Sequence, residues 1–395
     1  MFDIKYFDHA ATTKVHEEVF EAMKPFFCES FGNASSIYSL GVKSRIAVEA
    51  AREQVANAIG AKSKEIYFTA GGSESDNMAI RGVAHANRSK GNHIITSKIE
   101  HPAVLETCKL LEKDGFEVTY LDVDSKGVVD LEQLREAIRP ETILITIMMA
   151  NNEIGTIEPI EKIGEIAREH KILFHTDAVQ AVGNMPIDVK ALHVDLLSLS
   201  GHKLYGPKGI GAIYIRTGVR ISPLISGGHQ ERGKRAGTEN VPGIVGLGKA
   251  IEIASANLDA NVEKLTKLRN YYLDQVEKQI PHIRLNSSRE NCLPGTANIS
   301  FKFIEGESLL LRLDMCGICA SSGSACTSGS LDPSHVLLAI GVPADVAHGS
   351  LRISMGCENT KEDVDFLVEK LEGIVKTLRD MSPLYEDFLE GKYNP

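Results

Sequence analysis

The sequence predicts an α/β fold, with a mostly parallel sheet covered by helices on both faces and a smaller α+β domain at the C-terminal end. From about residue 60 to 215, short β-rich runs alternate with helix-like stretches, which is typical of a parallel sheet. Several of these runs are apolar without alternation, as expected of strands that are buried on both faces.

Seven strands are expected in the large sheet. They comprise residues 65–68, 93–96, 118–121, 143–147, 172–175, 196–199 and 211–215. Helical patterns over 103–113 and 160–170 separate some of them, and Pro159 suits the start of the second helix. We expect the last strand to be antiparallel, because little chain separates it from the strand before it.

The chain is predicted to divide into a large domain, 14–257, and a small domain, 258–395, which also takes in residues 1–13. The region from 240 to 280 reads as largely helical. Strand-like runs follow at 297–301 and 351–354.

A final helix is expected, with its apolar face running from Val364 to Leu378. Thr360 and Asp363 are spaced to form its capping box.

Composition limits the classes of function. The net charge of −10 gives no sign of a basic nucleic-acid-binding surface. No apolar run approaches the roughly 20 residues that cross a bilayer, and the first residues lack the pattern of a signal peptide. Seven cysteines at irregular spacings argue against a disulfide framework. We therefore expect a cytoplasmic protein with no direct nucleic-acid or membrane partner.

Lys203 follows a buried strand and lies among small residues. Desolvation at such a position lowers the pKa of an amine and makes it nucleophilic enough to form a Schiff base. Taken alone, an exposed loop lysine is the commoner interpretation.

Asp177 ends another predicted strand, at the carboxyl edge where open α/β sheets bind ligands. A carboxylate there can keep a pyridine nitrogen protonated, and Gln180, one turn further on, can bind a ring hydroxyl. The alternative for Asp177 is a helix N-cap.

Gly71 and Gly72, followed by Ser73, open a predicted helix after a third strand. Backbone N–H groups at a glycine-rich helix start form an anion site, to which Ser200 and His202 can add donors; a plain strand–helix turn is the alternative.

His101 follows a further strand and precedes a proline, where its ring can stack on a flat cofactor. A surface histidine at a turn is the alternative. The anion site, the carboxylate and the lysine thus fall at the carboxyl ends of different strands, and this coincidence favours one shared site.

Cys326 lies in the small, polar segment 320–330, which we expect to be an exposed and mobile loop. A cysteine there is placed to react, although an inert loop cysteine is the alternative. Cys316 and Cys319 have metal-ligand spacing, but without a second pair they more simply mark a turn and the start of a strand.

Arg352 is a strand arginine flanked by apolar residues. Its guanidinium can grip a substrate carboxylate in bidentate fashion, or it can pair with a structural aspartate or glutamate.

From residue 6 to about 365, the chain closely resembles the group I cysteine desulfurases of the NifS/IscS type. These belong to the class V aminotransferase family of fold-type I pyridoxal-phosphate enzymes. The motifs that carry the resemblance are residues 6–13 (YFDHAATT), 72–77 (GSESDN), 151–155 (NNEIG), 175–180 (HTDAVQ), 200–203 (SGHK), 235–238 (RAGT) and 321–328 (SSGSACTS). The chain departs from the family pattern at two places. Gly72-Ser73 stands where many relatives have Ala-Thr, and Cys357 stands where relatives often have another residue.

The resemblance implies a role for each candidate residue. Lys203 resembles the lysine that forms the Schiff base with pyridoxal 5′-phosphate, and His101 resembles the histidine stacked over its ring. Asp177 and Gln180 look like the partners of the ring nitrogen and the phenolate oxygen. The residues that resemble the family's phosphate-binding set are Gly72, Ser73, Ser200, Gly201 and His202.

The remaining roles concern substrate, sulfur and the second subunit. Asn152 and Arg352 resemble the substrate-binding residues, with Asn152 also near the cofactor. Cys326 looks like the persulfide cysteine, which would make L-cysteine the substrate and L-alanine the product. Thr238 resembles a phosphate ligand donated by the other subunit of a homodimer.

Two competing interpretations remain open. An aminotransferase on the same scaffold would need no reactive cysteine. Alternatively, the chain is mainly a sulfur-delivery partner, in which the C-terminal tail at 382–390 docks an iron–sulfur scaffold protein. Cys326 would then also be a transient ligand of a 2Fe–2S cluster shared with the scaffold. The sequence does not choose between cluster assembly, tRNA thiolation and a nitrogenase-specific pathway as the destination of the sulfur.

Overall fold

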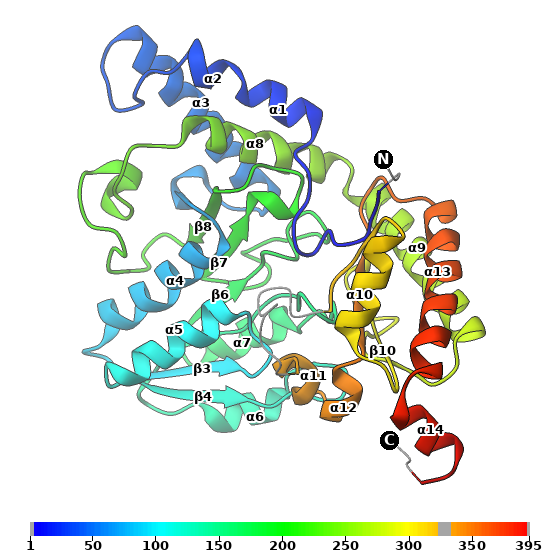
Figure 1. Cartoon of the computed structure of the whole chain (residues 1–395). Helices are drawn as coiled ribbons and strands as arrows, with labels where there is room; N and C mark the ends of the chain where they lie inside the picture. Colours follow the sequence, from blue (N-terminus) through cyan, green and yellow to red (C-terminus); the bar gives the residue numbers. More distant parts are fainter. Residues whose placement is uncertain (1–3, 323–332, 393–395) are drawn as a thin grey trace.

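The computed structural model of the protein describes residues 4–322 and 333–392 (Figure 1). Its large sheet has seven strands in the order β2-β8-β7-β6-β5-β3-β4. These strands are β2 (Ile66–Thr69), β3 (His93–Ser97), β4 (Glu117–Leu121), β5 (Thr142–Thr146), β6 (Leu173–Asp177), β7 (Leu196–Ser200) and β8 (Gly211–Ile215). Only β8 runs antiparallel to its neighbours, so the mostly parallel sheet and its antiparallel last strand are confirmed.

Helices cover both faces of this sheet, as the sequence predicted. The helices that surround it are α1 (Glu17–Met23), α2 (Pro25–Cys28), α3 (Ser39–Ala58), α4 (Gly72–Asn87), α5 (Pro102–Lys113), α6 (Leu131–Ala137), α7 (Ile160–Glu169) and α8 (Val241–Ala256). Adjacent strand residues point to opposite faces. Ile94 therefore packs in one core cluster with α4 and α5, while Ile95 packs in another with α3, α7 and α8.

A second, three-stranded antiparallel sheet has the order β12-β10-β9. Its strands are β9 (Ile283–Leu285), β10 (Thr296–Phe301) and β12 (Ser350–Ser354), and its helices include α9 (Leu258–Gln279), α10 (Gly306–Met315) and α13 (Lys361–Asp380). Phe7 is fully buried in the core that these elements share. This grouping resembles the small domain expected from the sequence, but the domain division itself stays a prediction.

The ends of the chain add short elements (Figure 1). β1 (Lys5–Tyr6) pairs in parallel with β11 (Ile318–Cys319). The capping box of α13 is confirmed, because Thr360 Oγ1 accepts from Asp363 N–H at 3.2 Å and Asp363 Oδ2 accepts from Thr360 N–H at 3.0 Å. The remaining helices are α11 (His335–Ala339), α12 (Ala344–Ala347) and α14 (Pro383–Leu389), with 3-10 turns η1 (Ser63–Glu65), η2 (Gly201–Lys203) and η3 (Gln230–Gly233). Across residues 4–322 and 333–392, no helix has the length and apolar character needed to cross a membrane.

A buried ion pair holds the η3 segment against α3 and β2. Arg52 of α3 donates from Nη1 and Nη2 to the two carboxylate oxygens of Glu231, at 2.7 and 2.8 Å. Glu231 also accepts from the backbone N–H of Phe68 at 2.9 Å, and both side chains of the pair are almost fully buried. Because η3 precedes Thr238 by a few residues, this pair fixes the start of the segment that carries Thr238.

The change Arg52→Ala tests this anchor. It leaves the Glu231 carboxylate buried without its guanidinium, which should lower the free energy of unfolding by about 3–5 kcal/mol. Urea unfolding followed by circular dichroism measures the loss. Glu49→Ala is the matched control, because Glu49 binds the same arginine at 3.1 Å from an exposed position and should cost under about 1 kcal/mol. Equal losses in the two variants would contradict the anchor.

Candidate active site

One cavity of about 890 Å³ gathers most of the residues that the sequence singled out. It opens where the chain leaves β3, β6 and β7 and where α4 begins. The sequence-predicted site residues that line it are Gly72, Ser73, His101, Asn152, Asp177, Gln180, Ser200, His202, Lys203 and Arg352. This location agrees with the general rule that open α/β sheets bind ligands at the carboxyl ends of their strands.

Three predicted residues do not line this cavity. Gly201 is buried next to it, where an added Cβ would lie 3.1 Å from the Pro207 carbonyl oxygen. Thr238 is exposed on the segment after η3. Cys326 lies outside the residues that the structure describes, together with most of its predicted loop.

Lys203 ends the short turn η2, directly after β7, and is half-buried. Its Nζ donates to the backbone oxygens of Ala10 and Ala11, the latter at 2.7 Å. Gln180 Nε2 donates to the same Ala10 oxygen at 2.9 Å. The N-terminal segment therefore holds the amine at the cavity wall, in contrast to the exposed loop lysine that was the alternative.

Asp177 is the last residue of β6 and is buried. Its Oδ1 accepts from the Val179 N–H at 2.9 Å, which is the local contact that the N-cap interpretation anticipated. Burial raises the pKa of this carboxyl, while the positive charges available at His101 and Lys203 lower it. Burial also lowers the pKa of His101, and the negative charge of Asp177 opposes that shift. The carboxylate thus lies in a place that favours a cationic ligand group.

The start of α4 forms an anion cup. Gly71 has a φ of 155° at the N-cap, and the next residues, Gly72 and Ser73, face a hollow that Ser200 and His202 also line. A Cβ on Gly72 would lie 2.7 Å from Val179 Cγ2, so in this chain the Val179 side chain occupies the space that an alanine methyl group would need. Burial lowers the pKa of His202 to about 4, and its imidazole is therefore neutral near pH 7. Backbone N–H groups, a hydroxyl and an imidazole are donors that fit the phosphate of pyridoxal phosphate.

Arg352 forms the structural ion pair that was one of its two expected roles, while its role as a substrate-carboxylate ligand stays a prediction. It lines the cavity from β12, yet its Nη2 pairs with Asp8 Oδ1 at 2.8 Å and its Nη1 donates to the Asn152 backbone oxygen at 2.8 Å. The guanidinium is almost fully buried. A ligand carboxylate at this position would therefore share the arginine with Asp8.

Sequence reasoning missed several buried polar residues around the cavity. Glu153 accepts from the Ser334 hydroxyl at 2.5 Å, and His335 Nε2 lies 3.0 Å from the Glu100 backbone oxygen. Burial raises the pKa of Glu100 to about 8. Asp76 also lines the cavity. Asp76 and Glu153 fall within recognised motifs, which marked their segments, but nothing local distinguished Ser334 or His335.

The cysteine pair with metal-ligand spacing adopts the simpler arrangement. Cys316 caps the C-terminus of α10 and Cys319 enters β11, as the sequence suggested. Over the described parts of the chain, no cluster of three or more His, Cys, Asp or Glu residues is arranged to hold a metal ion.

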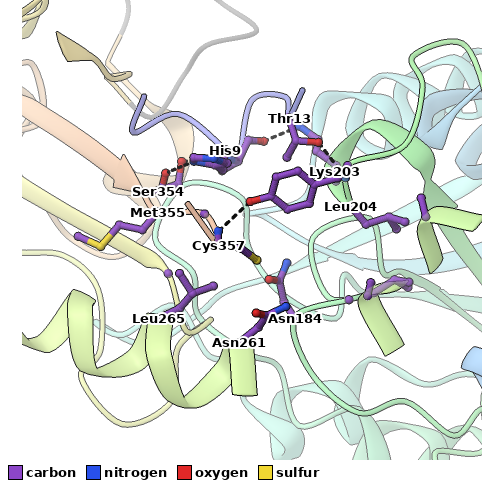
Figure 2. A pocket seen from close by; sticks show the side chains of 18 of the residues that line it. His9, Thr13, Asn184, Lys203, Leu204, Asn261, Leu265, Ser354, Met355 and Cys357 are labelled. Atoms are coloured by element: carbon purple, nitrogen blue, oxygen red, sulfur yellow. Dashed lines mark hydrogen bonds between the residues drawn. The ribbon is translucent and has the colours of Figure 1, made fainter. Parts of the chain in front are cut away.

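A smaller cavity of about 260 Å³ lies on the other side of Lys203 (Figure 2). His9, Asn184, Asn261 and Cys357 contribute to its wall, and the hydroxyl oxygen of Tyr205 accepts from the Cys357 N–H at 2.9 Å. Its volume is below the roughly 300–1,000 Å³ of common ligand pockets. We regard it as packing space behind the turn that carries Lys203.

Comparisons with known proteins agree with this site. The family model described as aminotransferase class-V matches residues 5–367. A cysteine desulfurase IscS from Clostridium botulinum is 58% identical over 389 residues, covering 98% of both chains. Among solved structures, a NifS-like protein has a TM-score of 0.90 at 42% identity, covering 95% of this chain and all of that one. A structure of SspA in complex with cysteine has a TM-score of 0.80 at 43% identity, covering 89% of this chain and 98% of that one.

These similarities extend over nearly the whole chain and include the segments that build the cavity. The chain therefore belongs to the aminotransferase class-V family, among its cysteine desulfurases.

Proposed function

We propose that this chain converts L-cysteine to L-alanine with pyridoxal phosphate bonded to Lys203, and that it collects the sulfur as a persulfide on Cys326. Family membership provides the reaction class and implies the cofactor. The residue roles rest on one observation, which is that Lys203, Asp177 and the anion cup line the same cavity.

The cofactor site would be divided among three groups of residues. Gly72, Ser73, Ser200, Gly201 and His202 hold the phosphate at the start of α4. Asp177 would bind the ring nitrogen, which would give its buried carboxyl a cationic partner, and Gln180 and Asn152 would bind near the phenolate oxygen. His101 stacks on the ring.

When bound, pyridoxal phosphate supplies a carbonyl carbon that bonds to amines and a protonated ring that accepts the electron pair of a broken Cα–H bond. The protein supplies the proton carrier. The ε-amine of Lys203 takes the Cα proton of the substrate, and its contacts with Ala10 and Ala11 keep it at the cavity wall.

Arg352 and Asn152 would orient the substrate by its carboxylate. Arg352 is preorganised, because Asp8 and the Asn152 backbone fix its guanidinium before a ligand arrives. The SspA relative was solved in complex with cysteine, which supports cysteine as the substrate.

Sulfur transfer needs no external oxidant. The Cys326 thiolate attacks the substrate sulfur, so an S–S bond forms as the C–S bond breaks. The electron pair of the C–S bond goes to carbon, which a proton converts to the methyl group of alanine. The persulfide then passes its outer sulfur to an acceptor.

The acceptor would be an iron–sulfur scaffold protein or a relay for tRNA thiolation, and Cys326 would be a transient 2Fe–2S ligand in the first case. The similarity to IscS proteins favours the scaffold. We assign the site of action to the cytoplasm, with no direct contact to nucleic acid.

A homodimer would complete the site. Thr238 is exposed and lies outside the cavity of its own chain, so as a phosphate ligand it would serve a second copy. Large apolar side chains are exposed nearby on α1, α2 and α3 and the loop between α2 and α3. They are Phe20, Phe27, Phe31, Ile37, Tyr38 and Ile46. Arg52 ties α3 to η3, which precedes the Thr238 segment, so an interface that includes α3 would also lie near this segment.

The change Cys326→Ala tests the persulfide step. The variant should bind cofactor and L-cysteine but lose at least about 100-fold in alanine and sulfide release, because it lacks the nucleophile. Alanine formation and the mass of the peptide containing residue 326 are measured after adding L-cysteine. Cys316→Ser, at the end of α10, is the control and should turn over normally. Undiminished activity of Cys326→Ala, above all on keto acids, would favour an aminotransferase instead.

The change Lys203→Ala tests the assignment of the cofactor lysine. Borohydride treatment of the holoenzyme should attach the cofactor to the peptide that contains Lys203, and mass spectrometry should detect no attachment in the variant. The exposed Lys190→Ala variant serves as control and should be labelled at Lys203 like the parent protein. Labelling at another lysine in the parent would refute the assignment, whatever the activity of the variant.

A further inference from the structure

Asp76 is a buried carboxyl with no assigned role. It lies one turn into α4, beyond the anion cup, and lines the main cavity with Asp177. Its side chain is almost completely buried, and its Oδ1 has no hydrogen-bond partner among the residues that the structure describes. A buried carboxylate oxygen in this state is costly if it carries a negative charge.

His175 is the nearest group that could compensate such a charge, with its Nε2 3.7 Å from Asp76 Oδ1. It is fully buried on β6, two residues before Asp177. Thr146 Oγ1 lies 2.8 Å from its Nδ1, and Ser198 Oγ lies 3.0 Å from its Nε2. Burial lowers the pKa of His175 to about 3, so the ring is neutral at physiological pH. It therefore gives Asp76 no positive charge.

The titratable neighbours of Asp76 are mostly acidic. Burial and then the negative charge of Asp177 raise the pKa of Asp76 well above its ordinary value; a hydrogen bond from Ser198 opposes this shift and Glu100 adds to it. Burial raises the pKa of Asp177 as well, but His101 and Lys203 oppose that shift. Two buried carboxyls that line one cavity and repel each other do not both ionise, and the one whose upward pKa shift is opposed by such neighbours ionises first. An anion in the cup at the start of α4 would disfavour a charge on Asp76 further.

We propose that Asp76 is a positioning residue that stays protonated in the folded protein and so confines the negative charge of the Asp76–Asp177 pair to Asp177. The charge then lies where the ring nitrogen of the cofactor is to bind. This inference rests on the role proposed for Asp177, but its main tests do not involve the reaction.

The first test is infrared spectroscopy of the full chain labelled with ¹³C-aspartate, with and without cofactor. A carbonyl band of a protonated aspartic acid should appear near neutral pH and should be absent from Asp76→Asn. Glu100→Gln is the control and should leave this labelled band in place. Absence of a protonated aspartate band in the parent protein would overturn the proposal, even if the variants do not fold.

The second test is the pH dependence of thermal unfolding. Because the folded-state pKa of Asp76 lies above its ordinary value of 3.8, the folded chain holds the proton more tightly than the unfolded chain. The unfolding temperature of the parent should therefore fall relative to Asp76→Asn as the pH rises from about 4. A difference that does not change with pH, or that changes in the opposite direction, would show that Asp76 is ionised in the fold.

The third test asks whether Asp76 carries a charge next to the cofactor site. The visible absorbance of the holoenzyme is titrated with pH in the parent, Asp76→Ala and Asp76→Asn. Both variants should titrate within about 0.3 pH units of the parent, because position 76 is uncharged in all three proteins. A shift of the midpoint by on the order of one pH unit in both variants would show that the parent carries a negative charge at Asp76, and the proposal would fail. Loss of desulfurase chemistry alone would count against the proposed function and not against the protonation of Asp76.

Discussion

The need to keep one negative charge inside the protein, at Asp177, governs the construction of the site. Removing a carboxylate from water costs several kcal/mol unless partners compensate it. Here the compensation is spread over several groups: the Val179 N–H donates to the carboxylate, and interactions with His101 and Lys203 oppose the rise in pKa that burial causes. A cationic ring nitrogen would complete the balance, so the same arrangement that makes Asp177 costly in isolation makes it a strong ligand for that ring.

Sheet topology brings these groups together, and the N-terminal segment ties them to the rest of the molecule. The parallel strands β3, β6 and β7 place the residues that follow them at one edge. Residues 7–11 then cross this edge, with Phe7 buried in the core of the smaller sheet and Ala10 accepting from Gln180 and Lys203. Asp8 binds Arg352 on β12. One short segment thus links the core of the smaller sheet to the cavity.

Features that depend on local sequence were predictable, and those that depend on distant pairing were not. Strand periodicity located β2 to β8 to within about two residues, and chemistry at strand ends pointed to Lys203, Asp177 and the anion cup. Neither Asp8 as the partner of Arg352 nor Glu231 as the partner of Arg52 has a local signal, because each joins elements more than 100 residues apart. The environment of Asp76 likewise depends on three strands that meet only in the folded chain.

The Asp8–Arg352 pair has a consequence for substrate binding. If Arg352 receives the substrate carboxylate, that group enters a cavity where the guanidinium charge is already balanced by Asp8 and where Asp177 carries a further negative charge. The incoming carboxylate gains little net attraction unless Asp8 yields part of its contact. Weakening that contact would loosen the segment whose Ala10 and Ala11 carbonyls hold Lys203. Under the proposed roles, residues 8–11 would therefore connect carboxylate binding at Arg352 with the contacts that hold the Lys203 amine.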